Sequence, residues 1–380
     1  MANLECKLHV LIVGAGLGGL AAAIGCARAG HIVTVLEAAK EITEVGAGLQ
    51  ITPNASRLIQ KWGLGDALQE AAAEPTSLTV HRYSDGKILA TEHAFNIHMR
   101  EKYHAPFLDL HRADLQRILY DHAQHLGVEF HLAARVTDLD LSGPTVKVET
   151  GSIYAADLVI AADGLWSRCR EIFLGESDPP IPTGDLAYRI VLSLDAIEEA
   201  DLRDLVAKPA VHFWIGPGAH AVGYSLRGGE MYNLVLLVPD DLPENVSRRP
   251  GSVEEMRALF TDWDPLLNRL LNLVQTVDKW KLMHRPTLKS WINEEHNFLM
   301  IGDASHPMLP YLAQGANSSM EDGAALGTLL ENLKSKSELT RILETFQHLR
   351  KIRGEAIARE TFRQVGNSFS GPLKLREKLR

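Results

Sequence analysis

A carboxylate placed between a strand and a helix start is the clearest sign of chemistry in this sequence. An apolar segment ends at Gly302 and Asp303, so we expect the Asp303 side chain to emerge from the end of a strand. A Pro-containing turn follows, and a helix is expected over residues 315–330. A helix start carries unpaired N–H groups and about half a positive charge, which can stabilise an anionic ring such as a reduced flavin. The residues expected at this helix start are Gly315, Ala316 and Asn317.

A glycine-rich turn near the N-terminus predicts a nucleotide-binding site. An apolar run over residues 8–13 precedes the turn and an Ala-rich helical segment follows it, which indicates a βαβ unit. The turn reads G-x-G-x-x-G, with Gly14, Gly16 and Gly19 at the glycine positions. These glycines would supply a tight turn, room for a pyrophosphate against bare backbone, and a close helix–strand contact. Glu37 ends the second strand, where its carboxylate can accept hydrogen bonds from an adenosine ribose.

A third segment also carries an acidic residue at a strand end. An apolar run from Ala156 ends at Asp163 and Gly164, and together with Ser167 and Arg170 the segment reads D-G-x-x-S-x-x-R. In isolation, an Asp-Gly pair after a strand is most simply interpreted as a turn. The two other motifs favour a cofactor site instead.

The three motifs, in this order, resemble those of the single-component flavoprotein aromatic hydroxylases, of the salicylate hydroxylase and 3-hydroxybenzoate 6-hydroxylase type. The resemblance covers nearly the whole chain. It implies that Asp303 binds the ribityl hydroxyls of FAD, that Arg112 contacts FAD from its helix start, and that Asp163 and Gly164 serve both FAD and the nicotinamide cofactor. The cofactor-binding residues expected from the motifs and the resemblance are Gly14, Gly16, Gly19, Glu37, Arg112, Asp163, Gly164, Gly302, Asp303, Gly315, Ala316 and Asn317.

The resemblance also implies how the cofactors are used. FAD would be bound noncovalently, and NADH or NADPH would bind only transiently as the electron donor. In agreement, the sequence shows no second strand–glycine–helix unit. The implied reaction transfers one oxygen atom of O2 from a flavin C4a-hydroperoxide to an electron-rich aromatic ring. A base or a cation near a phenol oxygen would assist it, and the site would have to exclude water.

Candidates for the substrate site come from a region of alternating strands. His220 and Tyr224 match in spacing a His/Tyr pair of the 3-hydroxybenzoate and 6-hydroxynicotinate hydroxylases. Residues four apart on a strand share a face, so His220 could act as a base and Tyr224 as a relay. The alternative is a turn-exposed histidine beside a packed tyrosine. Arg189 could pair with a substrate carboxylate or phenolate, and a structural salt bridge is an equal alternative.

By the resemblance, Pro310 and Tyr311 lie at the reactive edge of the flavin. The 6-hydroxynicotinate enzyme has a histidine at the position of Tyr311 and another at the position of Gln50, which ends the Gly-rich loop after residue 44. Both departures indicate a different substrate for this chain.

The fold expected is α/β: an FAD-binding Rossmann-type domain, p-hydroxybenzoate hydroxylase-like, with an inserted antiparallel β-sheet substrate domain and a C-terminal helix. A meander over residues 211–215, 221–226 and 233–238 supports the inserted sheet. The predicted FAD domain comprises 1–75, 107–183 and 286–330, the substrate domain 76–106 and 184–285, and the C-terminal helical segment 331–380.

The composition of the chain disfavours some classes of binding partner. The formal net charge is -9 over 380 residues, which argues against nucleic acid or an anionic membrane as the main partner. A basic cluster after residue 373 is expected to be a solvated end. The uncharged stretch over residues 10–27 has the length of a membrane span, but its glycine spacing is better explained by the nucleotide-binding turn. Three dispersed cysteines fit a reducing compartment, so we expect a cytoplasmic protein.

The sixteen histidines show no metal-ligand pattern, so no metal is expected. Whether the chain is a monomer or a homodimer stays open, as do the ring hydroxylated and the choice between NADH and NADPH. Two other functions are alternatives to the aromatic hydroxylase. One is an FAD-dependent oxidoreductase of the same fold that catalyses dehydrogenation or epoxidation, and the other is a flavin-binding redox sensor without turnover.

Overall fold

A computed structural model of the chain describes residues 6–42 and 47–368, with side chains as far as residue 363. Two predictions lie outside these residues: the first part of the Gly-rich loop, with Gly46, and the basic C-terminal cluster. No helix in the described ranges is long and apolar enough to cross a membrane.

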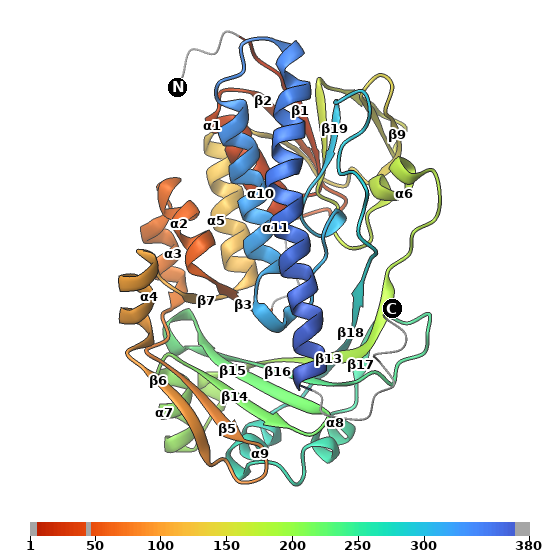
Figure 1. The fold of residues 1–380 in the computed structure, drawn as a ribbon. Helices are drawn as coiled ribbons and strands as arrows, with labels where there is room; N and C mark the ends of the chain where they lie inside the picture. Colours follow the sequence, from red (N-terminus) through yellow and green to blue (C-terminus); the bar gives the residue numbers. More distant parts are fainter. Residues whose placement is uncertain (1–5, 43–46, 369–380) are drawn as a thin grey trace.

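A five-stranded parallel sheet forms the centre of the flavin unit (Figure 1). The strand order is β19-β12-β1-β2-β8, and neighbouring strands pair in parallel throughout. The strands span His9–Val13 (β1), Ile32–Leu36 (β2), Glu129–His131 (β8), Leu158–Ala161 (β12) and Phe298–Met300 (β19). Strands β1, β12 and β19 are almost continuously apolar, because helices and loops bury both faces of such a sheet.

Four long helices lie side by side along this sheet in Figure 1. They are α1 (Leu17–Arg28), α5 (Arg112–His125), α10 (Gly315–Leu330) and α11 (Leu339–Ser368). The helix predicted over 315–330 is therefore confirmed. Helices α1 and α10 approach so closely that a Cβ on Gly25 would lie 2.5 Å from the carbonyl oxygen of Gly323, and only glycine fits there.

An eight-stranded sheet forms the second layer and crosses the lower end of the helices in Figure 1. Its order is β17-β18-β13-β16-β15-β14-β5-β6, and all pairs are antiparallel except β5–β14. The strands are β5 (Ser77–Arg82), β6 (Ile88–His93), β13 (Ile181–Ser193), β14 (Ala210–Gly216), β15 (Ala219–Leu226), β16 (Met231–Pro239), β17 (Arg248–Gly251) and β18 (Val277–His284). The predicted meander is confirmed as β14, β15 and β16.

The two faces of this sheet have different environments. One face packs against its own core, with Trp214, Tyr232 and Leu234 buried beside three short helices. These helices are α7 (Ala200–Ala207), α8 (Val253–Leu259) and α9 (Pro265–Asn272). The other face lies against the flavin unit and carries the predicted substrate-binding residues. The α/β fold class is confirmed, while the domain boundaries given above stay a prediction.

Smaller elements complete the flavin unit. One three-stranded sheet contains β9 (Val136–Asp140), β10 (Thr145–Val148) and β11 (Ile153–Ala155). A second contains β3 (Gly48–Ile51), β7 (Leu108–His111) and β4 (Ala72–Ala73), and it lies between the central helices and the eight-stranded sheet. The remaining helices are α2 (Pro53–Lys61), α3 (Gly65–Ala71), α4 (Phe95–Tyr103) and α6 (Arg168–Leu174).

Candidate active site

A cavity lies where β1, β12 and β19 end side by side. Because the carboxyl ends of neighbouring parallel strands meet at one sheet edge, the three sequence motifs converge there although they are far apart along the chain. Seven of the predicted cofactor-binding residues line this cavity: Gly16, Arg112, Gly164, Gly302, Asp303, Gly315 and Ala316.

The glycine turn has the geometry that its spacing predicts. Gly14 has φ +103°, and a Cβ there would lie 2.6 Å from the Ala162 carbonyl oxygen. A Cβ on Gly19 would lie 2.0 Å from the Gly14 carbonyl oxygen, so helix α1 could not approach the turn. A Cβ on Gly16 would meet no described atom within 4 Å, because this position opens into the cavity. The open space fits a pyrophosphate against bare backbone.

Glu37 holds this turn. Its carboxylate accepts hydrogen bonds from the backbone N–H groups of Ala15 and Ala39, both at 2.7 Å. The side chain is therefore aimed at the turn from the end of β2, as its position in the sequence predicts. Its contact with a ribose stays a prediction.

The Asp163 side chain is engaged within the protein. Its carboxylate accepts hydrogen bonds from the Ser167 hydroxyl at 2.6 Å and from the Cys169 N–H at 3.0 Å, so it fixes the start of α6. Gly164, with φ +75°, is the part of this motif that lines the cavity. The direct role of Asp163 toward a cofactor stays a prediction, while its structural role is clear.

Arg170 connects the second motif to the third. It is buried, pairs with Asp178 at 2.6 Å, and donates a hydrogen bond to the Ala304 carbonyl at 3.2 Å. The motif D-G-x-x-S-x-x-R therefore holds the backbone directly after Asp303. The sequence showed this arginine but gave no sign of its partner.

Asp303 is the carboxylate that the cavity presents to a ligand. Its side chain faces the open cavity and makes no hydrogen bond to any other described residue. Loss of water contact within the cavity raises the pKa of the Asp303 carboxyl, while the positive charges of His306 and Arg112 oppose the rise. A carboxylate without a partner at this place fits the hydroxyl groups of a ribityl chain.

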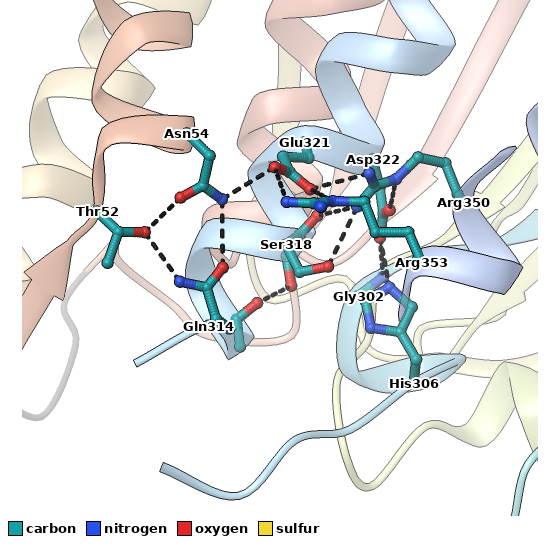
Figure 2. Close-up of polar contacts among 12 residues, drawn as sticks. Thr52, Asn54, Gly302, His306, Gln314, Ser318, Glu321, Asp322, Arg350 and Arg353 are labelled. Atoms are coloured by element: carbon teal, nitrogen blue, oxygen red, sulfur yellow. Dashed lines mark hydrogen bonds and ion pairs between the residues drawn. The ribbon is translucent and has the colours of Figure 1, made fainter. Parts of the chain in front are cut away.

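Behind the cavity lies a buried charge network that sequence reasoning did not assign (Figure 2). The Asp322 carboxylate in α10 accepts hydrogen bonds from the Gly302 N–H at 3.0 Å, from His306 at 2.7 Å and from Arg350 of α11 at 2.7 Å. The His306 ring also stacks on Trp291, with 4.9 Å between centroids. The network fixes the backbone of the flavin motif relative to both long helices.

The charges in this network stabilise one another. Burial lowers the pKa of His306, but the Asp322 carboxylate outweighs this effect, and the net pKa is raised. Burial would raise the pKa of Asp322, but His306 and Arg350 lower it overall. His306 follows Asp303 in the turn and Asp322 lies in the helix expected over 315–330, so two ionisable residues in this otherwise largely apolar stretch were the available signal.

Asn317 connects helix α10 to β3. Its side chain accepts a hydrogen bond from the Thr52 N–H at 3.0 Å and donates one to the Gln50 carbonyl at 2.9 Å. Thr52 also contacts Gln314 and Asn54 in Figure 2. The Asn317 side chain is thus engaged in hydrogen bonds within the protein. The backbone of the helix start around it remains available to a ligand.

His220, Tyr224 and Arg189 lie on one face of the eight-stranded sheet. Val222 lies between the first two on β15 and is opposite Val235 of β16, which is in turn opposite Arg189 of β13. The predicted shared face of His220 and Tyr224 is therefore confirmed. The alternative of a turn-exposed histidine is wrong, because His220 lies within β15 with 8% of its surface exposed.

Burial dominates the protonation of these groups. It lowers the pKa of His220 to about 4, so the imidazole is neutral at pH 7 and able to accept a proton. Burial raises the pKa of the Tyr224 hydroxyl, and the negative charge of Asp109 adds to this rise. Burial lowers the pKa of Arg189, and the charge of Arg112 adds to this effect.

Arg189 has no carboxylate partner within the described ranges. Its guanidinium lies 5.1 Å from the centre of the Trp280 ring, and its buried Nε has no hydrogen-bond partner there. The alternative of a structural salt bridge is therefore not observed among these residues. A cation on Trp280 with free donors is suited to an anionic group of a ligand.

Tyr311 connects the flavin motif to the substrate face. The short helix Pro310–Leu312 carries it, and its ring lies 5.6 Å from that of His220. Its hydroxyl donates a hydrogen bond of 3.1 Å to Asp185 of β13. Pro310 is exposed beside it. The predicted place of Tyr311 at the reactive edge of the flavin stays a prediction, and its contacts with His220 and Asp185 were not predicted from the sequence.

The chain matches known proteins along almost its full length. The family model described as FAD binding domain matches residues 7–361. The FAD-dependent monooxygenase OpS4 of Beauveria bassiana (strain ARSEF 2860) is 49% identical over 98% of this chain and 89% of its own length. A 3-hydroxybenzoate 6-hydroxylase of Polaromonas naphthalenivorans (strain CJ2) is 33% identical over 97% of this chain and 90% of its own length.

Solved structures agree with this assignment. The structure of CtdE in complex with FAD and a substrate superimposes with a TM-score of 0.85 at 26% identity, and it covers 95% of this chain and 89% of its own. An FAD site accounts both for these similarities and for the three strand ends, the glycine turn and Asp303 that meet at one cavity. The chain belongs to the FAD binding domain family, and its relatives in that family are FAD-dependent monooxygenases and aromatic hydroxylases.

Proposed function

We propose that this chain is an FAD-dependent monooxygenase that hydroxylates a phenolic or aromatic-acid substrate, with NADH or NADPH as electron donor and O2 as co-substrate. One observation carries the proposal. His220, Tyr224 and Arg189 share the sheet face that the flavin unit covers, and Tyr311 of the flavin motif contacts that face directly. Arg189 pairs with no carboxylate of the described residues. A base, a phenol and a cation are thereby brought next to the place of the cofactor.

The residues that line the cavity would hold FAD noncovalently. The Gly16 backbone and the start of α1 would receive the pyrophosphate, Asp303 the ribityl hydroxyls, and the start of α10 the flavin ring. When bound, FAD supplies the activation of O2 and the transfer of one oxygen atom. Gly164 would border the nicotinamide donor during its transient binding.

The substrate face would bind and polarise the ring. Arg189 would pair with a carboxylate or phenolate and so fix the orientation of the substrate. The neutral imidazole of His220 would accept the phenol proton, which leaves the ring more electron-rich and ready for attack by an electrophilic oxygen. Tyr224, whose pKa is raised, would stay protonated and orient the substrate oxygen as a donor. Apolar neighbours such as Val222 and Val235 would exclude water.

The substrate is expected to differ from 6-hydroxynicotinate. Tyr311 and Gln50 occupy the two positions at which that hydroxylase has histidines. Gln50 donates a hydrogen bond of 3.0 Å to Asp109, so it is engaged within the protein. The relatives include a hydroxylase named for 3-hydroxybenzoate and one named for hispidin.

The test is product analysis with the purified, FAD-loaded chain. NADH and NADPH oxidation would be measured with 3-hydroxybenzoate, salicylate and larger phenols, and products would be examined by mass spectrometry. The proposal expects a phenol that accelerates oxidation and gains one oxygen atom. Fast oxidation that yields only hydrogen peroxide would mean that the phenol is an effector and not the substrate, whereas a dehydrogenated product would favour the alternative oxidoreductase of the same fold.

Two further proposals concern the cellular location and the oligomeric state of the enzyme. The dispersed cysteines, of which Cys26 and Cys169 are buried and free, support a reducing cytoplasmic location. A monomer or a homodimer is proposed, and sedimentation of the FAD-loaded chain would distinguish the two.

A further inference from the structure

Asp185 is a buried carboxyl on the substrate face. It lies near the start of β13 with 7% of its surface exposed, and its Oδ2 accepts the hydrogen bond from the Tyr311 hydroxyl at 3.1 Å. The two residues belong to different units, since Tyr311 follows the flavin motif. This hydrogen bond therefore joins the cofactor turn to the substrate sheet.

The register of the sheet places Asp185 close to His220. Ala187, two residues after Asp185 on β13, is opposite Leu237 of β16, and Leu237 is opposite His220 of β15. Asp185 and His220 thus share one face, about two strands apart. The Tyr311 ring lies against the His220 ring, with 5.6 Å between centroids and a tilt of 45°, so Tyr311 contacts both His220 and Asp185.

The surroundings of Asp185 raise the pKa of its carboxyl. Asp240, at the end of β16, is the nearby carboxylate, and its own partner is Lys281 of β18 at 3.3 Å. Burial raises the pKa of Asp185 to about 6, Asp240 adds to the rise, and the hydrogen bond from Tyr311 opposes it. The pKa of His220, lowered by burial to about 4, is below this value, so a proton is held more firmly at Asp185 than at His220.

We propose that Asp185 receives, through Tyr311, the proton that His220 takes from a phenolic substrate. This inference rests on the proposed hydroxylase function. The substrate O–H bond breaks, the ring oxygen keeps the electron pair, and the proton moves to His220. It then passes to the Tyr311 oxygen while the hydroxyl proton of Tyr311 moves to Asp185 Oδ2. Asp185 finally releases a proton to water and returns to the carboxylate, so the proton taken from the substrate leaves the site while the negative charge stays on the ring oxygen. Asp185 acts through Tyr311 and is thus a positioning and proton-accepting residue.

The first experiment tests the pair without any substrate. Infrared spectra of the FAD-loaded full chain would be recorded while the pH is lowered through about 6. A protonated carboxyl band should appear in the wild type and be missing in Asp185→Asn, which keeps the acceptor oxygen but cannot ionise. Tyr311→Phe should raise the midpoint of the band, because it removes the hydrogen bond that favours the carboxylate. Asp204→Asn, at an exposed site in α7, is the control and should change neither.

The second experiment tests the role in turnover. With the phenols of the product screen, the wild-type rate should fall as the pH drops through about 6, because protonated Asp185 cannot accept. Asp185→Asn should lose this acidic limb and turn over more slowly, on the order of tenfold or more.

The outcomes separate the inference from the proposed function. A band that persists in Asp185→Asn, a midpoint that Tyr311→Phe does not move, or an unchanged pH profile would overturn the inference. If no phenol gains oxygen, the proposed function fails, and with it the proton transfer from a substrate, even where the infrared titration shows that Asp185 and Tyr311 titrate as a pair.

Discussion

The backbone N–H of Gly48 donates a hydrogen bond of 2.7 Å to the side-chain oxygen of Asn233, which joins β3 of the flavin unit to β16 of the substrate sheet. A Cβ on Gly48 would lie 2.5 Å from Asn233 Cγ and 2.6 Å from Tyr224 Cε2. The absence of a side chain at Gly48 therefore sets how closely the two units approach, and it fixes the position of Tyr224.

Gly48→Ala should displace Tyr224 and Asn233 and reduce the amount of hydroxylated product per NAD(P)H oxidised. Overpacking at such a contact costs about 1–3 kcal/mol, so the free energy of unfolding should also fall. Denaturant unfolding and product-to-oxidation ratios would measure both effects. Gly143→Ala, where a Cβ meets no described atom within 4 Å, is the control and should behave as the wild type. A normal ratio in Gly48→Ala would contradict the prediction.

Gly16→Ala and Gly19→Ala should separate cofactor binding from folding. A Cβ on Gly16 has space within the protein but intrudes on the pyrophosphate, so this variant should fold normally and bind FAD at least about tenfold more weakly. Gly19→Ala places a Cβ 2.0 Å from the Gly14 carbonyl oxygen and should lose both stability and FAD. Flavin fluorescence titration and thermal unfolding of the apoprotein would test this. Equal stability losses in the two variants would argue against the assignment.

Arg189→Met should raise the KM for an aromatic acid by about tenfold to a hundredfold, because a charge-assisted hydrogen bond contributes about 1.5–3 kcal/mol. Steady-state kinetics with acidic and neutral phenols would measure the effect, which should be small for neutral ones. Arg248→Met is the matched control, since Arg248 also stacks on Trp280, at 4.2 Å, but pairs with Asp278. A KM equally raised in both variants would mean that stacking on Trp280 is what matters.

His220→Ala should lower the rate of product formation by about a hundredfold, the usual contribution of a general base. The His220 imidazole itself becomes protonated as the pH falls through about 4, below the limb near pH 6 that is expected from Asp185. Rapid-quench product analysis would measure the rate of product formation. His93→Ala, an exposed histidine of β6, is the control. Unchanged product turnover in His220→Ala would exclude the base role.

The Asp322–His306 pair should make stability depend on pH. Because the pKa of His306 is raised in the folded protein, the folded state holds its proton more firmly than the unfolded state. The resulting stability is complete below the unfolded pKa of about 6.5 and is lost as the pH rises through the folded value. Urea unfolding of the apoprotein from about pH 6 to 9 should show this decline, and Asp322→Asn should weaken it. A wild-type stability that rises over this range would refute the prediction.

The local motifs could be predicted from the sequence because each depends on neighbouring residues. The roles of Gly14 and Gly19 could be predicted from one strand–turn–helix unit, and the position at which α10 begins could be predicted from Gly315. By contrast, the bond of Arg170 to Ala304 spans 134 residues and that of Tyr311 to Asp185 spans 126. Such pairs depend on how the sheets are stacked, which a single sequence does not reveal.

The shared face of His220 and Tyr224 lies between these two cases. Their spacing on a strand required it, whereas the place of Arg189 in the same row came only from the register of β13 against β16. Asp163 shows the opposite situation. Its position in a motif suggested a cofactor contact, but its carboxylate is engaged by Ser167 and the backbone of α6.

The strand order of the parallel sheet bears on how this protein is made. Strand β1 occupies the centre, yet its neighbour β12 is completed by β19, whose residues leave the ribosome after those of the entire eight-stranded sheet. Asp303 and helix α10 come later still. Although the glycine turn is synthesised first, the cofactor cannot be enclosed until about four-fifths of the chain has emerged. The nascent enzyme should therefore stay colourless until late in translation and become yellow only near its completion.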